Sequence, residues 1–516
     1  MKNKSKSLAS LLLVFFSVFG VAQEKTRVSV NPTEDAPQIS KHIYGHFAEH
    51  LGRCIYDGFY VGEDSEIPNL DGVRKDIIAA LKEMKIPNLR WPGGCFADTY
   101  HWKDGIGAKS ERPTIVNQWW GGVTENNSFG THDFLNLCEA LETEAYISGN
   151  IGSGTVREFA DWIQYVNHDG VSPMADLRRE NGREQPWDVR FWGLGNEAWG
   201  CGGNMTAEFY SNLYRQYATY MTDWSNSSNL YRVASGASDG NYNWTEVLMK
   251  NIPKNLIEAV ALHSYSVIDW GNKGSATDFS DTQYFQTMQR AYKMDEYITG
   301  HTAIMEQYDP ENKIDLIVDE WGGWYDVESG TNPGFLYQQN TMRDAMIAGM
   351  TLNIFNNHAE RVKMANLAQT VNVLQAVILT EGEKLILTPT YHVLKMYAVH
   401  QDAQLIPLEF KSPLFTKNGE TLPAISLSAS RGKNKNPSIS LVNIDDSQSH
   451  TVAIELSKLK VKNFNAIILT SESLQDYNDF DHPHAITPKP FKKIKIKNGE
   501  ATIELPPFSV IVLEGN

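Results

Sequence analysis

The chain has 516 residues, with 62 acidic and 46 basic side chains and a formal net charge of −16 at pH 7. This length exceeds one ordinary domain, and a hydrophobic content of 41% is typical of a globular protein with a large core. The acidic balance argues against nucleic acid or anionic membranes as partners.

The first residues have the pattern of an export signal. Three lysines within the first six residues precede an apolar stretch over 8–21, and small residues follow before Gln23. This pattern predicts a signal peptide over 1–22 and an exported protein, periplasmic or extracellular. The stretch is too short for a membrane span, and no later segment is apolar for long enough, so we expect none.

After a short alternating run at 26–30, apolar strands alternate with helices up to about residue 400. The predicted helices include 73–84, 134–143, 156–166, 207–224, 284–297 and 335–355, and the eight predicted strands lie near Ile43, Leu89, Tyr146, Phe191, Val233, Ala261, Ile317 and Met364. Such alternation predicts parallel βα units, and eight strands close a (β/α)8 TIM barrel, an α/β fold. We therefore expect the barrel domain over 43–400.

Beyond residue 400 the chain has short strands separated by turn residues and little helix. The strands are expected over 405–410, 424–430, 438–444, 452–456, 466–469 and 509–513. This pattern predicts an antiparallel, jelly-roll-like β-sandwich over 401–516.

The four cysteines are few for an exported protein of this size. Cys54, Cys95, Cys138 and Cys201 match no zinc-binding spacing and form no CxxC pair. A disulfide stays open as an alternative to free thiols. We expect no metal site and no cofactor.

One stretch, 191–200 (FWGLGNEAWG), points to chemistry. Its strand ends at Gly195, and Asn196 and Glu197 follow between two tryptophans. Apolar walls raise the pKa of a carboxyl group and keep it protonated near neutral pH. Glu197 is therefore a candidate general acid, against the alternative of a Glu in an ordinary turn.

A second carboxylate, Glu320, ends the most apolar strand of the chain and is followed by Trp321. Because Glu320 lies three βα units after Glu197, the two strand ends should face each other at the C-terminal end of the barrel. Two carboxylates there suit glycoside hydrolysis, in which one protonates the leaving oxygen and the other attacks the anomeric carbon.

Further polar residues follow other predicted strands and should reach the same end. Each alone also fits a satisfied turn or core group, but their joint placement favours a binding site. In this interpretation Asn196 holds the sugar hydroxyl next to the reacting carbon and Tyr265 steers the nucleophile. Glu49 and Gln369 clamp hydroxyls, and Cys95 is an apolar wall or a weak donor. His263 belongs to the same group.

Several short motifs carry a family resemblance. They lie at 46–50 (HFAEH), 90–96 (RWPGGCF), 150–155 (NIGSGT), 195–197 (GNE), 319–321 (DEW) and 364–369 (MANLAQ). With them the chain, from about residue 26 to its C-terminus, resembles the α-L-arabinofuranosidases of glycoside hydrolase family 51. The Asn-Glu pair alone is shared with a whole clan of barrel glycosidases, whereas the other motifs are narrower.

The resemblance implies a retaining double displacement with Glu197 as acid/base and Glu320 as nucleophile. It places Glu49, Cys95, Asn196, Tyr265 and Gln369 around a terminal arabinofuranose of an arabinan- or arabinoxylan-type substrate. It also implies that residues 26–42 join the β-sandwich and that the protein is a homo-oligomer.

Two other functions stay open at this point. A related clan activity, endo-β-1,4-glucanase or β-xylosidase, would use the same two carboxylates. A catalytically silent sugar-binding protein is the third interpretation, and the presence of both carboxylates argues against it.

Overall fold

The computed structural model describes residues 25–225 and 229–516, so the predicted signal peptide lies outside the described residues. Eight parallel strands close a barrel in the order β10-β11-β12-β13-β2-β5-β8-β9. These strands are β2 (Gly45–Phe47), β5 (Asn88–Trp91), β8 (Glu144–Gly149), β9 (Phe191–Leu194), β10 (Tyr231–Ser238), β11 (Ala259–Ser266), β12 (Asp315–Gly323) and β13 (Val362–Ala368). The predicted barrel is confirmed, and seven of the eight predicted strand positions lie within its strands, whereas Ile43 lies just before β2.

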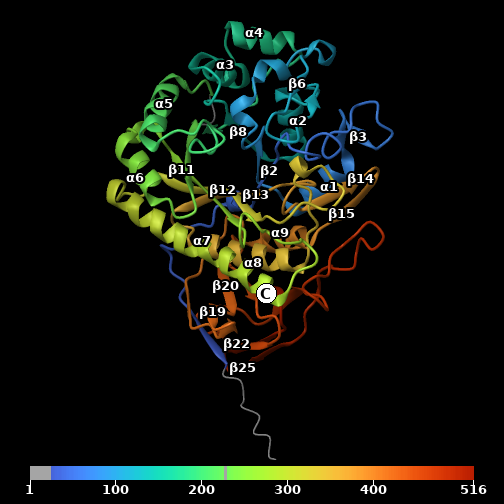
Figure 1. Cartoon of the computed structure of the whole chain (residues 1–516). Coiled ribbons are helices and arrows are strands. Elements are labelled where there is room, and N and C mark those ends of the chain that lie inside the picture. The colour runs from blue at the N-terminus through green and yellow to red at the C-terminus, as the bar shows by residue number, and fades with distance from the viewer. Residues whose placement is uncertain (1–24, 226–228) are drawn as a thin grey trace, which may run out of the picture.

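The helices lie on the outside of this barrel (Figure 1). They are α1 (Lys75–Met84), α2 (Thr131–Leu141), α3 (Val156–Asn167), α4 (Pro173–Glu180), α5 (Ala207–Tyr220), α6 (Tyr242–Asn251), α7 (Asp281–Tyr308), α8 (Met342–Asn357) and α9 (Pro389–Tyr397). None of the helices within the described ranges combines the length and the apolar composition needed to cross a membrane.

Some predicted bounds are wrong, each for a local reason. The first strand starts at Gly45 because the preceding Lys41–Tyr44 form a 3-10 turn capped by the Ser40 hydroxyl. Helix α8 starts at Met342 and not near residue 335, because Thr341 and Asp344 form a capping box that satisfies its first N–H groups.

The rest of the chain forms two larger sheets, in addition to the barrel. One has the order β17-β1-β22-β26-β25 and the other β16-β20-β21-β27-β23-β24. The strands are β1 (Thr26–Val30), β16 (Gln404–Leu405), β17 (Leu408–Phe410), β20 (Ile425–Arg431), β21 (Pro437–Asn443), β22 (His450–Glu455), β23 (Phe464–Leu469), β24 (Lys489–Pro490), β25 (Ile494–Lys497), β26 (Glu500–Leu505) and β27 (Ser509–Gly515). Short hairpins complete the fold: β3 (Asn69–Leu70) with β4 (Val73–Arg74), β6 (Ile115–Val116) with β7 (Thr124–Glu125), β14 (Ile378–Glu381) with β15 (Lys384–Leu387), and β18 (Leu414–Lys417) with β19 (Glu420–Pro423).

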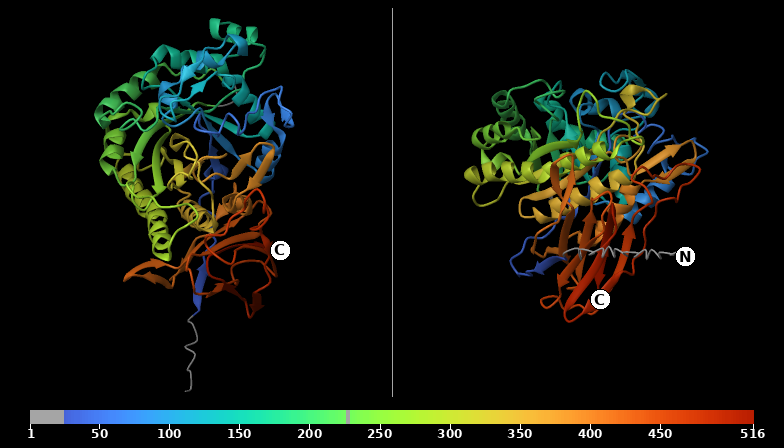
Figure 2. Two further views of the ribbon diagram at one scale, coloured as in Figure 1. Left: turned by 45° about the vertical axis from the view of Figure 1, so that its right-hand side comes forward. Right: turned by 60° about the horizontal axis from the view of Figure 1, so that its bottom comes forward.

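The mostly-sheet C-terminal part confirms the predicted fold class. Strand β1 pairs antiparallel with β17 and parallel with β22, so the first described strand lies in a sheet built from C-terminal strands. Both views of Figure 2 show it beside them. The single strand predicted over 405–410 is split, because β16 pairs with β20 and β17 pairs with β1. Pro407 stands between them, and a proline has no N–H to continue a ladder.

The barrel interior is packed and is not a channel. Buried side chains from its strands form one cluster: Tyr146, Phe191, Tyr231, Val233, Ala259, Ala261, Ile317 and Met364. Polar side chains lie beyond this cluster, at the C-terminal end of the strands. This is the end of such barrels at which active sites are built.

Candidate active site

The structure brings the predicted site residues together at the C-terminal end of the barrel. Tyr265 and His263 lie on β11 and Glu320 on β12, whereas the others follow strands: Glu49 after β2, Cys95 after β5, Asn196 and Glu197 after β9, and Gln369 after β13.

Glu320 is held at both of its carboxylate oxygens. The Tyr265 hydroxyl donates to Oε2 at 2.7 Å, and Arg90 Nη1 donates to Oε1 at 2.8 Å. The Glu320 side chain is only 7% exposed. A buried guanidinium and a phenol therefore fix the Glu320 carboxylate in one orientation.

Glu197 lies opposite and is more open, with a side chain that is 20% exposed. Its Oε1 is 3.0 Å from His263 Nδ1. Burial raises the pKa of Glu197, the His263 contact opposes that rise, and the negative charge of Glu320 adds to it. Such a carboxyl group suits proton donation.

The two carboxylates are close together. Glu197, His263 and Glu320 each place one polar atom within 4.8 Å of the others. Inverting glycosidases keep their carboxyl groups about 6.5–9.5 Å apart to seat a water, whereas retaining ones keep about 5–5.5 Å. The spacing here fits the retaining geometry.

His263 connects the two sides of the site. Its Nε2 lies 3.1 Å from Asp319 Oδ1, and Tyr146 donates its hydroxyl to Asp319 Oδ2 at 2.8 Å. Burial by itself lowers the pKa of His263, but the negative charges of Glu320 and Asp319 raise it to about 10. The imidazole is therefore a cation at neutral pH, placed beside Glu197.

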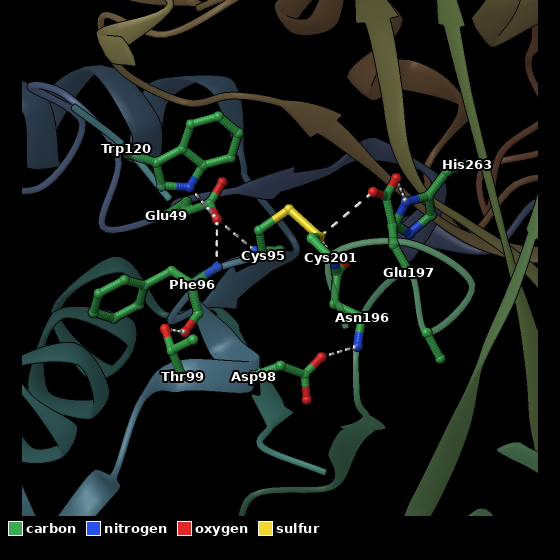
Figure 3. Close-up of a disulfide and its surroundings, with 12 residues drawn as sticks. Glu49, Cys95, Phe96, Asp98, Thr99, Trp120, Asn196, Glu197, Cys201 and His263 are labelled. Atoms are coloured by element: carbon green, nitrogen blue, oxygen red, sulfur yellow. Dashed lines mark hydrogen bonds and ion pairs between the residues drawn. A yellow bond between two sulfur atoms is a disulfide. The ribbon is translucent and has the colours of Figure 1, made fainter. Parts of the chain in front are cut away.

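Glu49 accepts hydrogen bonds on both oxygens. The Phe96 backbone N–H and the Trp120 indole donate to Oε1 at 3.1 and 2.9 Å (Figure 3). The Gly94 N–H also donates to Oε1, at 3.0 Å, and the Gln369 amide donates to Oε2 at 3.0 Å. Burial raises the pKa of Glu49 to about 7, and the charge of Glu320 adds to the rise. The pair of Glu49 and Gln369 is a fixed acceptor and donor at the wall of the site.

Asn196 is clamped from two sides. Arg90 Nη2 donates to its side-chain oxygen at 2.7 Å, and its backbone N–H donates to Asp98 Oδ2 at 2.8 Å. The other oxygen of Asp98 accepts from the backbone N–H groups of Ile151 and Gly152. Asp98 thus joins the loops that follow β5, β8 and β9 under the site.

Cys95 is not a free thiol, because it forms a disulfide with Cys201 (Figure 3). The open question on disulfides is thereby answered, and the role of weak donor falls away, since a disulfide sulfur carries no hydrogen. Cys201 Sγ lies 3.7 Å from Glu197 Oε2, which makes this bridge an apolar wall in contact with a catalytic candidate. Cys54 and Cys138 are buried free thiols.

Two groups of side chains have a spacing that would also suit a metal ion. In the first, the sulfurs of Cys95 and Cys201 are used in the disulfide. In the second, formed by Glu197, His263 and Glu320, both ring nitrogens of His263 already face carboxylates. The absence of a metal site stays a prediction.

Four residues of the site were not singled out from the sequence: Arg90, Asp98, Trp120 and Asp319. Arg90 carried a signal, because an arginine inside an otherwise apolar strand must find buried acidic partners. Asp319 carried a weaker one, as the neighbour of Glu320. Asp98 and Trp120 lie in loops, and nothing local in the sequence marks them.

Comparisons with known proteins agree with the family resemblance seen in the sequence. The family model described as "Alpha-L-arabinofuranosidase 1 domain" matches residues 80–283, and that described as "Alpha-L-arabinofuranosidase C-terminal domain" matches 319–509. A Bacteroides ovatus protein named "Intracellular exo-alpha-L-arabinofuranosidase" is 48% identical over 513 residues, which is 99% of each chain. The crystal structure of a family 51 arabinofuranosidase from Xanthomonas axonopodis pv. citri superposes with a TM-score of 0.94 at 44% identity, covering 95% of this chain and 100% of that one. An α-L-arabinofuranosidase from Thermotoga maritima in complex with arabinose gives a TM-score of 0.84 at 30% identity, covering 95% and 99%.

The prediction of export is corrected by the Bacteroides ovatus relative. The Bacteroides ovatus protein is named intracellular, and its similarity covers 99% of this chain, so the matched region extends into the N-terminal segment. A few lysines before an apolar stretch describe composition only, and they do not by themselves make a segment an export signal. The expectation of a signal peptide and a secreted protein is therefore not supported.

Proposed function

The chain belongs to the α-L-arabinofuranosidases of glycoside hydrolase family 51, and from this premise we propose that it is an exo-acting retaining enzyme. It removes terminal non-reducing α-L-arabinofuranosyl residues from arabinan- or arabinoxylan-type polysaccharides and oligosaccharides. The observation that carries the mechanism is the short separation of Glu197 and Glu320, within 4.8 Å between their nearest polar atoms.

In the first step Glu320 attacks the anomeric carbon while protonated Glu197 donates its proton to the glycosidic oxygen. The carbon–oxygen bond to the leaving group breaks, and a covalent arabinosyl ester forms on Glu320. In the second step Glu197, now a carboxylate, takes a proton from water, and that water displaces Glu320 from the anomeric carbon. Two inversions return the original anomer, and both glutamates regain their starting protonation.

The surrounding residues act on charge and position. Arg90 and the Tyr265 hydroxyl orient the Glu320 carboxylate for attack. In this proposal Asn196 binds the 2-hydroxyl of the sugar, while Glu49 and Gln369 bind other hydroxyls. The contact to the 2-hydroxyl strengthens in the transition state and so lowers the barrier.

The test is hydrolysis of an aryl α-L-arabinofuranoside and an aryl β-D-xyloside by the wild type, Glu197→Ala and Glu320→Ala. We expect the wild type to cleave the arabinoside and both variants to lose this activity. Azide should restore turnover in Glu197→Ala, because azide is a nucleophile that needs no general base. The arabinosyl azide should keep the substrate's anomeric configuration in Glu197→Ala and have the opposite one in Glu320→Ala. Preferred cleavage of the xyloside, or full activity of either variant, would contradict the assignment.

We also propose that the protein is a homo-oligomer, which rests on the family resemblance alone. Light scattering coupled to size exclusion measures the mass directly. A particle of 58.1 kDa, the mass of one chain, would overturn this part.

A further inference from the structure

One tryptophan near the site is unusually open to solvent. The chain has 13 tryptophans, all within the described ranges, and only Trp119 and Trp270 are classed as exposed, Trp270 at 57%. Trp270 follows β11, four residues after its last residue, Ser266. An exposed indole forgoes the burial that normally stabilises so large an apolar side chain.

Trp270 is the outer end of a row of aromatic rings that begins at the nucleophile. The Tyr265 hydroxyl contacts Glu320 at 2.7 Å, and the Tyr265 ring packs edge-to-face on Trp324 at 5.1 Å between centroids. Trp324 in turn packs edge-to-face on Trp270 at 5.3 Å. The row thus runs from the reacting centre to solvent without a gap.

The loop around Trp270 holds the indole in place. The Asp269 carboxylate, which precedes Trp270, accepts hydrogen bonds from the backbone N–H groups of Gly271 and Asn272, the two residues that follow it. Gly274 and Asp326 exchange two further hydrogen bonds, of 2.9 and 3.1 Å, which join this loop to the segment that carries Trp324. The exposed ring is therefore a positioned surface, prepared before any ligand arrives.

We propose that Trp270 is a stacking platform for a sugar ring on the leaving-group side of the scissile bond. This inference rests on the proposed function and extends it. In an exo-acting enzyme the terminal arabinofuranose lies at the carboxylates, so the remaining saccharide must extend from there toward solvent. The apolar C–H face of a sugar ring packs on an indole, and Trp270 offers the outermost such face along this row. The preferred substrates are then oligosaccharides and polymers, and a small aryl group does not reach the platform.

The experiment compares an arabinofuranosyl-substituted xylotriose with an aryl α-L-arabinofuranoside. We expect Trp270→Ala to lower the ratio of kcat/KM for the oligosaccharide to that for the aryl substrate by about tenfold, and Trp270→Phe to recover part of it. The matched control is Tyr220→Ala, which removes a ring that is 59% exposed at the far end of α5. That variant should keep the wild-type ratio.

A ratio in Trp270→Ala within twofold of wild type would overturn the inference. So would an equal loss on both substrates, because the indole would then only support Trp324. Change of the oligomeric state with an unchanged ratio would identify the surface as a contact between chains and also overturn it.

A binding measurement separates failure of this inference from failure of the proposed function. In the Glu320→Ala background, calorimetry should show that adding Trp270→Ala weakens binding of the xylotriose derivative about tenfold and leaves binding of free arabinose unchanged. No cleavage by the wild type would refute the proposed function, whereas equal oligosaccharide affinity with and without Trp270 would refute the platform alone.

Discussion

His263 shows how a single neighbouring residue changes the pKa of the acid/base candidate, Glu197. It faces Glu197 through Nδ1 and Asp319 through Nε2, and the nearby Glu320 and Arg90 complete the charges around Glu197. Since the pKa of His263 is raised to about 10, the cation persists through neutral pH and lowers the pKa of Glu197 from what burial alone would produce. The pKa of the proposed proton donor is thus raised by burial and lowered by a neighbouring cation.

Replacing His263 with Gln should move the alkaline limb of the pH profile. Loss of the cation raises the pKa of Glu197 further, so the proton is retained to a higher pH than in the wild type. Steady-state kcat/KM against pH measures this shift, together with an activity loss of about tenfold from lost positioning. The control is His358→Gln, which removes a histidine paired with Asp295 outside the site. An unmoved alkaline limb in His263→Gln would contradict the assigned role.

Gly94 has to be glycine because the Glu320 carboxylate is so close. A Cβ built there would lie 2.7 Å from Glu320 Oε1 and 3.3 Å from Asn196 Nδ2. Arg90 and Tyr265 hold that carboxylate, so Gly94→Ala must displace it, and we expect activity to fall about a hundredfold. Gly200→Ala is the control, because its Cβ would meet only the Glu197 carbonyl at 3.6 Å. Kinetics of both variants on an aryl arabinofuranoside test the difference. Equal activities would show that the Glu320 carboxylate moves aside without loss of activity.

At the scale of elements, two of the loops that carry site residues are tied to each other at two points. The Cys95–Cys201 bridge joins the loop after β5 to the loop after β9, across 106 residues of sequence. Asp98 joins the same two loops by its hydrogen bond from Asn196. Glu197 lies between these two ties, at a positive φ of 40° that a rigid loop must maintain.

Removing this disulfide should destabilise the protein. A disulfide typically contributes about 2–4 kcal/mol, mostly through the unfolded chain. We expect the double variant Cys95→Ala/Cys201→Ala to unfold at lower temperature than wild type under oxidising conditions. A reductant should lower the unfolding temperature of the wild type to a similar value but leave the variant unchanged, since Cys54 and Cys138 are already free. A reductant effect on the variant would contradict this.

At the scale of the whole molecule, α8 joins the barrel to the C-terminal sheets. Every residue from Met342 to Asn356 is buried. Phe355 packs edge-to-face on Trp321 of β12, while the Asn353 side-chain oxygen accepts hydrogen bonds from the hydroxyls of Ser428 and Ser440. A barrel without the sheets would expose this helix, so we expect the two parts to unfold together.

Asn353→Leu tests that connection. It removes the acceptor that the Ser428 and Ser440 hydroxyls share and should cost about 1–3 kcal/mol. Calorimetry should show one cooperative transition in both wild type and variant, at a lower temperature in the variant, with KM for the aryl substrate unchanged. Two separate transitions would show that the barrel and the sheets are independent.

The sequence by itself determined the barrel, its eight strands, the mostly-sheet C-terminal part and the two carboxylates. The reason is that these features are local: each strand is an apolar run of a few residues. Glu197 follows such a strand, whereas Glu320, predicted to end its strand, lies three residues before the end of β12. The order of strands then follows from the closure of a parallel barrel.

Only the tertiary structure decided the pairing of Cys95 with Cys201, the contacts of Arg90 with Glu320 and Asn196, and the aromatic row that ends at Trp270. Each of these joins segments that are far apart in sequence, and no periodicity or composition along the chain encodes which distant loops meet. Such contacts form, and stabilise the protein, only after the barrel has brought the strand ends together.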